Sequence, residues 1–173
     1  MSSHTQERTM NAADLANEIG HPGAEELLRH ASLVRLAYSG RDGSPRVVPV
    51  GFHWNGRDVV VCTAPTAPKV KALSARPSVA LTIDTADTPA TAKALLIRGI
   101  ASIDIVEGVP AEYIEGSAKA LDDPQRQEFE AQVRQTYERM ARIAITPHWA
   151  RFYDFGAGRL PTFLSKLVDE AQR

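Results

Sequence analysis

The dipeptide Asn55-Gly56 separates two valine-rich segments, which run from Arg46 to Trp54 and from Asp58 to Thr63. Asn-Gly readily adopts the positive φ angles of a type I′ turn, so this pattern predicts an antiparallel hairpin. In such a hairpin Thr63 would lie opposite the Arg46 end of the first strand. The two side chains are therefore expected to be near neighbours.

A short helix is expected directly after the second strand. Pro68 fits the first helical position, and Lys69 and Lys71 then fall in the first turn, where the helix dipole disfavours cations by ~0.3–1 kcal/mol each. A bound phosphate would explain this placement, because it accepts hydrogen bonds from free backbone N–H groups and from lysines, and Arg46 could add a bidentate contact. The alternative is that the lysines are solvated, that Arg46 pairs with a surface carboxylate and that Thr63 only ends a strand.

Four other segments have the pattern of strands, namely 32–38, 78–84, 94–106 and 142–146, the last of them ended by Pro147. The first three strands are expected to form a meander. Gly99 within the long fifth strand suggests a bulge or bend. Pro49 cannot donate to a ladder, so part of its strand must lie at an edge or where pairing is interrupted.

Helices are expected at 11–19, 22–31, 109–121 and 162–171, and another begins at Asp123-Pro124. In that helix Phe129, Val133, Tyr137 and Met140 recur at helical spacing, which is typical of core packing. Together these elements predict a mostly β fold with flanking helices (α+β). The histidines at 4 and 21 have no partner at ligand spacing and are expected at the surface.

The composition suits one domain over residues 11–173, after a disordered tail at 1–10. A net charge of −1 argues against nucleic acid or an anionic membrane as a partner. The sequence shows no bilayer-spanning apolar run and no signal-peptide core, which favours a cytoplasmic protein. The single cysteine, Cys62, excludes a disulfide within the chain and is expected to be a buried apolar side chain rather than a nucleophile.

The hairpin ending in Thr63, the Pro/Ala-rich loop, Lys69 with Leu73 four residues later, and the following segment Arg76 to Ile83 resemble the pyridoxamine 5′-phosphate oxidase-like flavoproteins. The resemblance covers roughly residues 27–105. It implies a six-stranded antiparallel split β-barrel that binds FMN as a homodimer, with the flavin site at the subunit interface. The cofactor-binding residues that it implies, together with the cations noted above, are Arg46, Val47, Val48, Pro49, Val50, Thr63, Lys69 and Lys71.

The resemblance also implies an oxidoreductase for a small organic substrate, in which the flavin carries the hydride and no side chain is an obligate acid or base. Trp149, in an aromatic segment at 147–156, is a candidate to contact the partner's flavin, and a role in sealing the dimer interface remains equally open. A deazaflavin coenzyme is one alternative, with Arg35 or Arg41 serving its longer acidic tail. A non-catalytic flavin- or heme-binding protein is another, and heme would need His53 or His148 as axial ligand. No metal site and no catalytic triad is expected.

Overall fold

One antiparallel sheet, in the strand order β2-β1-β5-β6-β7-β4-β3, organises the computed structural model, which describes residues 10–85 and 88–171. The strands are β1 (Leu33–Ser39), β2 (Pro45–Gly51), β3 (His53–Trp54), β4 (Val59–Thr63), β5 (Ser78–Asp84), β6 (Lys93–Glu107) and β7 (Arg139–Asp154). The helices are α1 (Ala12–Ile19), α2 (Pro22–His30), α3 (Pro68–Ala75), α4 (Ala111–Ser117), α5 (Asp123–Thr136) and α6 (Thr162–Ala171). The tail expected at 1–10 lies, except for its last residue, outside the described residues.

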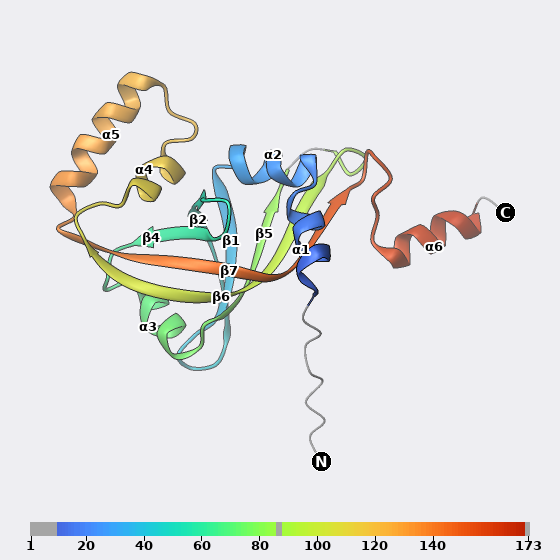
Figure 1. Ribbon diagram of the computed structural model, residues 1–173, viewed down its shortest axis with the longest axis horizontal. Coiled ribbons are helices and arrows are strands. Elements are labelled where there is room, and N and C mark those ends of the chain that lie inside the picture. Colours follow the sequence, from blue (N-terminus) through green and yellow to red (C-terminus); the bar gives the residue numbers. More distant parts are fainter. Residues whose placement is uncertain (1–9, 86–87, 172–173) are drawn as a thin grey trace, which may run out of the picture.

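The two edges of the sheet are consecutive in the chain. Strand β2 forms one edge and pairs with β1, whereas β3 forms the other edge and pairs with β4. Only Phe52, which is fully buried, separates β2 from β3. The edges must therefore lie close together, and the sheet curls into a barrel that stays open between them (Figure 1). The predicted class, mostly β with flanking helices in a split barrel, is confirmed, and the segment predicted as a single second strand is divided at Phe52.

The predicted long hairpin across Asn55-Gly56 is wrong. The turn exists, but β3 and β4 share only the pairs His53↔Val60 and Trp54↔Val59. Thr63 pairs with Ala141 of β7 instead of lying opposite Arg46. The expected three-strand meander is confirmed for β1 and β2, which pair, and is wrong for the third strand, because β2 is an edge strand and β4 pairs with β7. The edge position that Pro49 required is confirmed.

Strand β7 continues through Pro147, where the sequence predicted its end. Gly99 pairs with Pro147 and Arg98 pairs with Trp149, so His148 is an extra residue in a bulge. The bulge allows the proline because the ladder is already interrupted there. Gly99 is required on the opposite strand, since a Cβ at this position would lie 2.8 Å from the Thr146 carbonyl oxygen. The bulge predicted at Gly99 is confirmed.

Two apolar clusters fill the interior. The larger lies inside the curled sheet, under α2, and includes Phe52 and Phe152. The smaller joins α4 and α5 to the far ends of β6 and β7, and it contains Val109, Ile114, Val133 and Met140 with Phe129 and Tyr137 against it. The predicted packing role of the stripe from 129 to 140 is confirmed, although Met140 belongs to β7 rather than to the helix.

Helix α1 and helix α2 lie together over the sheet, as Figure 1 shows. His21 was expected at the surface, but it is only partly exposed. It is the N-cap of α2, where its Nδ1 accepts from the Gly23 N–H, and its ring lies 4.7 Å from that of Phe152. In the part of the chain that the structure describes, no helix is long and apolar enough to cross a membrane.

Candidate functional site

Helix α3 begins where the sequence predicted it. Pro68 occupies the first turn, and the N-cap residue, Ala67, provides no side-chain hydrogen bond there. Val70 and Leu73 are buried and hold the helix against the sheet. Pro68 has no N–H and the Val70 N–H donates to the Ala67 carbonyl at 2.9 Å, so the Lys69 N–H is the donor that this helix start offers to an anion.

The turn between β1 and β2 is held beside this helix by Arg76, which follows α3. The Arg76 guanidinium donates to the Gly40 carbonyl at 2.7 Å and to the Arg41 carbonyl at 3.3 Å. Within the turn the Gly40 N–H donates to the Ser44 carbonyl at 2.8 Å, and Gly43 has a φ of +81°. Arg76 thus fixes the position of a loop more than thirty residues earlier in the chain.

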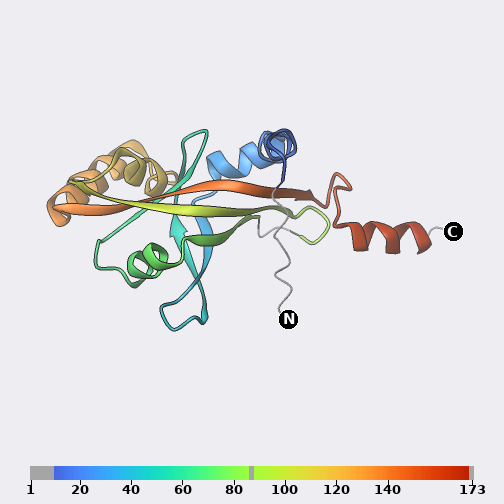
Figure 2. The same ribbon diagram turned by 60° about the horizontal axis from the view of Figure 1, so that its bottom comes forward.

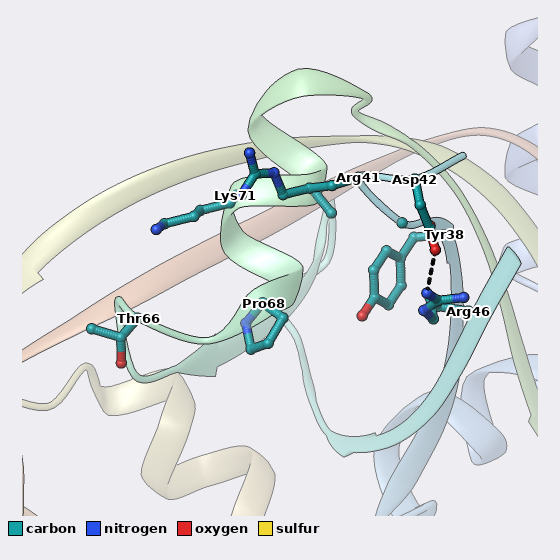
Figure 3. A pocket seen from close by; sticks show the side chains of 9 residues that line it. Tyr38, Arg41, Asp42, Arg46, Thr66, Pro68 and Lys71 are labelled. Carbon is teal, nitrogen blue, oxygen red and sulfur yellow. Dashed lines mark hydrogen bonds and ion pairs between the residues drawn. The ribbon is translucent and has the colours of Figure 1, made fainter. Parts of the chain in front are cut away.

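A cavity of about 470 Å³ lies between this turn and the start of α3 (Figure 3). Its wall contains three cations and one carboxylate. The lining residues are Tyr38, Gly40, Arg41, Asp42, Arg46, Thr66, Pro68, Lys71 and Ala72. The side chains of Arg41 and Lys71 make no ion pair with any residue in 10–85 or 88–171. The cavity therefore suits a ligand that carries negative charge.

Arg46 has a partner of its own in this cavity. Its guanidinium donates to the Asp42 carboxylate at 2.9 Å and to the Ser44 hydroxyl at 2.8 Å. Hydrogen bonds from Ser44, followed by the contacts with Arg46, lower the pKa of Asp42 to about 2. Asp42 is therefore ionised at neutral pH, and an incoming anion would compete with it for Arg46.

The other two predicted phosphate residues lie near this cavity without lining it. Lys69 is half-buried on α3, and burial lowers the pKa of its ammonium group. Thr63 ends β4, just before the loop that leads to α3. Among the predicted residues, the structure brings Arg46 and Lys71 together around one cavity.

The predicted flavin-edge residues divide between the two faces of β2. Val48 and Val50 are partly buried and pack against the larger core cluster. Val47 and Pro49 are exposed on the outer face. The backbone of β2 is also unpaired on the side away from β1, because β2 is an edge strand.

Trp149 lies on the same outer face as Val47. The strand register forms one cross-strand row that contains Val47, Ala37, Ala80, Arg98 and Trp149. The Arg98 guanidinium lies 4.5 Å from the centre of the Trp149 ring. Small side chains in the middle of this row leave a hollow on the face of the sheet.

This hollow has a volume of about 320 Å³ and shares Tyr38 and Arg46 with the cavity beside α3. Arg98 and His148 complete its polar wall, and the bulge in β7 is what turns His148 toward it. The cavity and the hollow together form a continuous polar surface around Tyr38 and Arg46. A ligand with a charged tail and a flat ring system could occupy both.

Sequence reasoning missed Tyr38, Asp42, Thr66 and Arg76 as parts of this site. Tyr38 and Asp42 come to the site through the β1–β2 pairing, which was part of the expected meander, but neither side chain was chosen as a candidate. Arg76 acts across the fold on Gly40, and no local pattern marks such a contact. Only Thr66 was close to a residue already chosen.

The site has no features of metal or thiol chemistry. Across the two described ranges, no cluster of three or more His, Cys, Asp or Glu side chains could hold a metal ion. Burial raises the pKa of the Cys62 thiol to about 12, so this residue is not a nucleophile at neutral pH.

Comparisons with known proteins agree with this architecture. Solved structures with a similar fold include an F420 reductase, with 23% identity, a TM-score of 0.54 and coverage of 73% of this chain and 94% of that one. They also include a conserved hypothetical protein from Mycobacterium tuberculosis (18% identity, TM-score 0.62, coverage of 92% and 94%). A third is the heme storage protein HutZ from Vibrio cholerae (19% identity, TM-score 0.56, coverage of 78% and 93%). At these identities the likeness shows the fold alone.

No curated protein sequence matches this chain significantly. The family model described as pyridoxamine 5′-phosphate oxidase, however, matches residues 21–156. Because this match covers well over half of the chain, the protein belongs to the pyridoxamine 5′-phosphate oxidase family.

Proposed function

We propose that this protein is an FMN-dependent oxidoreductase that acts on a small organic substrate. The observation that carries the proposal is the cavity beside α3, which is lined by Arg41, Arg46 and Lys71 together with the residue at the helix start, Pro68. A phosphate monoester carries up to two negative charges and accepts several hydrogen bonds, so it matches these donors. Membership in the family supports the same cofactor class.

The phosphate would be held by Lys71 and by the Lys69 N–H at the start of α3, with the Thr66 hydroxyl beside them. Arg46 would contribute once it exchanged the Asp42 carboxylate for the phosphate. Lys69 would add positive charge from the same helix turn, and Thr63 would lie at the end of the strand that leads there. Each direct charge-assisted contact would contribute about 1.5–3 kcal/mol to binding.

The ring system of the flavin would lie along the outer edge of β2. Edge-strand backbone from Val47 to Val50 offers unpaired carbonyl and N–H groups, except at Pro49, which has no N–H. A bound flavin supplies hydride transfer, and the chain contributes orientation, hydrogen bonds and exclusion of water. None of its side chains is required as an acid or base in this scheme.

We also propose that the outer face of the sheet is covered by a second copy of the chain. Val47 on β2 and Ile100 on β6 are large apolar side chains that remain exposed on this outer face. A homodimer through this face would cover them and would enclose the hollow next to Trp149. The flavin site would then be completed at the subunit interface.

The absorption spectrum of the purified protein is the first test, and a flavin spectrum from FMN is the expected result. Titration with FMN and with riboflavin then examines the phosphate site. Lys71→Ala should weaken FMN binding at least tenfold, and Lys69→Ala should weaken it less because Lys69 does not line the cavity. Both variants should leave riboflavin binding nearly unchanged. Arg139→Ala, which removes an exposed cation on β7 outside the cavity, is the control. Equal losses for both ligands would contradict the assigned phosphate site.

A deazaflavin coenzyme is a second candidate, and Arg41 favours it. This exposed guanidinium has no ion-pair partner in the described part of the chain and extends the positive surface beyond Lys71. A longer acidic tail would use it, and an F420 reductase has a similar fold. If Arg41→Ala weakened deazaflavin binding but left FMN binding intact, the second candidate would be favoured. A Soret band instead of a flavin spectrum would indicate heme, with His148 as the side chain that already faces the hollow.

A further inference from the structure

Helix α6 carries an apolar face that remains exposed in the part of the chain that the structure describes. Phe163 is 65% exposed, Leu167 is 58% exposed and Val168 is 44% exposed. Phe163 and Leu167 are four residues apart and therefore lie one above the other on the helix. Both views in Figures 1 and 2 show α6 extending away from the sheet. Exposed apolar side chains that gather on one helix face are typical of a contact surface.

The outward direction of α6 is built into the turn that precedes it. The backbones of Arg159 and Asp154 form two hydrogen bonds with each other. The Arg159 N–H donates to the Asp154 carbonyl at 2.8 Å, and the Asp154 N–H donates to the Arg159 carbonyl at 3.0 Å. The Arg159 guanidinium donates to the Phe152 carbonyl at 2.7 Å and lies 2.6 Å from the carboxylate of Glu18. Only Leu160 and Pro161 separate this anchored turn from the helix. The start of α6 is therefore confined to within ~11 Å of Arg159.

A groove of about 490 Å³ lies elsewhere on the same chain, between α1 and the β3–β4 turn. Most of its wall is apolar, and its lining includes one anion, Glu25, which pairs with Arg29 at 2.7 Å, and one cation, Arg57. The lining residues are Ala12, Leu15, Ala16, Ile19, Gly20, Glu25, Trp54, Gly56, Arg57, Thr146 and Pro147. Helix α6 of the same chain contributes no residue to this lining.

We propose that two copies of the chain exchange their C-terminal helices, so that each α6 lies in the groove of the other copy. The apolar pair Phe163 and Leu167 would enter the groove between α1 and Trp54. Lys166 and Glu170 flank this pair on α6. In the exchanged arrangement Lys166 would face Glu25 of the groove, and Glu170 would face Arg57. This is the helix-in-groove mode of recognition.

A second copy is the partner because each chain carries one exposed helix and one groove. A two-fold exchange satisfies both at once and closes the assembly. Two helices of about 15 Å, each burying apolar surface on both sides of the contact, would cover roughly 1,000 Å², which reaches the size of a specific interface. The exchange adds to the sheet-face contact proposed above and needs no bound cofactor.

Sedimentation measures the contribution of the helix to the dimer. Phe163→Asp combined with Leu167→Asp should raise the dimer dissociation constant about a hundredfold, because both anchors would then carry charge into an apolar groove. These side chains are exposed in the single chain, so the variant should keep its thermal stability when measured at concentrations where the wild type is monomeric. Thr162→Asp at the helix start is the control. An unchanged dissociation constant in the double variant would overturn the proposal.

Disulfide trapping identifies the contact itself. Leu167→Cys and Ala16→Cys are prepared as separate proteins, each also carrying Cys62→Ser, and are then mixed under mild oxidation. The expected product is a covalent heterodimer that forms only in the mixture. Asn17→Cys, which is exposed on α1 outside the groove, replaces Ala16→Cys in the control and should form little of it. If one chain carrying both cysteines closes within itself without a gain in mass, or if no heterodimer forms, the exchange does not occur.

Discussion

Glu18 is the side chain whose removal should cost this fold the most for a single polar change. It is only 7% exposed, and its carboxylate accepts from the Phe152 N–H at 2.7 Å and from the Arg151 guanidinium at 3.0 Å. The Arg159 guanidinium is the third partner, at 2.6 Å. These contacts tie α1 to the end of β7 and to the turn that precedes α6.

Glu18→Ala should lower the free energy of unfolding by ~2–4 kcal/mol. A buried N–H left without an acceptor costs ~1–3 kcal/mol, and the two ion pairs, whose arginines are more than a third exposed, contribute only ~0.5 kcal/mol each. The melting temperature should fall by ~5–15 °C. Urea unfolding followed by circular dichroism measures the change, with the exposed neighbour Asn17→Ala as control. A loss below ~1 kcal/mol would show that water replaces the carboxylate, and the reasoning would fail.

Three further predictions concern the barrel opening and the cavity. Gly116→Ala should destabilise the fold by ~2–4 kcal/mol in thermal unfolding, because its Cβ would lie 2.6 Å from the carbonyl carbon and oxygen of Phe52. Burial lowers the pKa of Lys119 from 10.5 to about 8, so the folded protein loses this proton at a lower pH than the unfolded chain does. The free energy of unfolding of the wild type, compared with that of Lys119→Met, should therefore rise by ~1 kcal/mol as the pH increases from 8 to 10.5. A flat difference in urea midpoints over that range would contradict this. Asp42→Asn should raise FMN affinity severalfold in calorimetry, since Arg46 would lose its competing carboxylate; weaker binding would show that Asp42 positions Arg46.

Elements with strong local signals could be predicted closely from the sequence. Strand β5 and helix α6 begin and end at the predicted residues. The alternating valine and leucine of β5 are a local signal that needs no distant partner. The proline before α6 and the helical spacing within it are local signals of the same kind. Pro147 misled in the opposite way. Proline usually ends a strand, but here Gly99 on the neighbouring strand supplies the bulge that allows β7 to continue.

The pairing of strands depended on one buried residue. Asn55-Gly56 is a strong turn signal, and the turn forms. The strand before it is interrupted at Phe52, however, so the hairpin across the turn has only two residue pairs. The aromatic ring gains more from full burial in the core than continued pairing would provide. Local patterns do not reveal this competition, because it depends on the volume left inside the finished barrel.

The candidate site shows the same division between local and distant information. The start of α3 was predictable, because Pro68 and the following lysines are adjacent in the sequence. The position of the opposite wall was not, because it depends on the contact between Arg76 and the Gly40 carbonyl, which are far apart in the sequence. The prediction that Arg46 and Thr63 lie opposite each other on paired strands was wrong. Arg46 still lies close to the start of α3, because the β1–β2 turn places it there.

The cavity already contains an anion of its own, and this determines how its cations would share a phosphate. Arg46 donates to Asp42, whose pKa of about 2 keeps it charged at neutral pH. A phosphate at Arg46 would replace one anion with another, because a guanidinium fork serves one bidentate partner at a time. Lys71 gives up no ion pair within the described residues. The larger share of phosphate affinity should therefore come from Lys71 and from the Lys69 N–H, both in the first turn of the helix that Pro68 marks in the sequence.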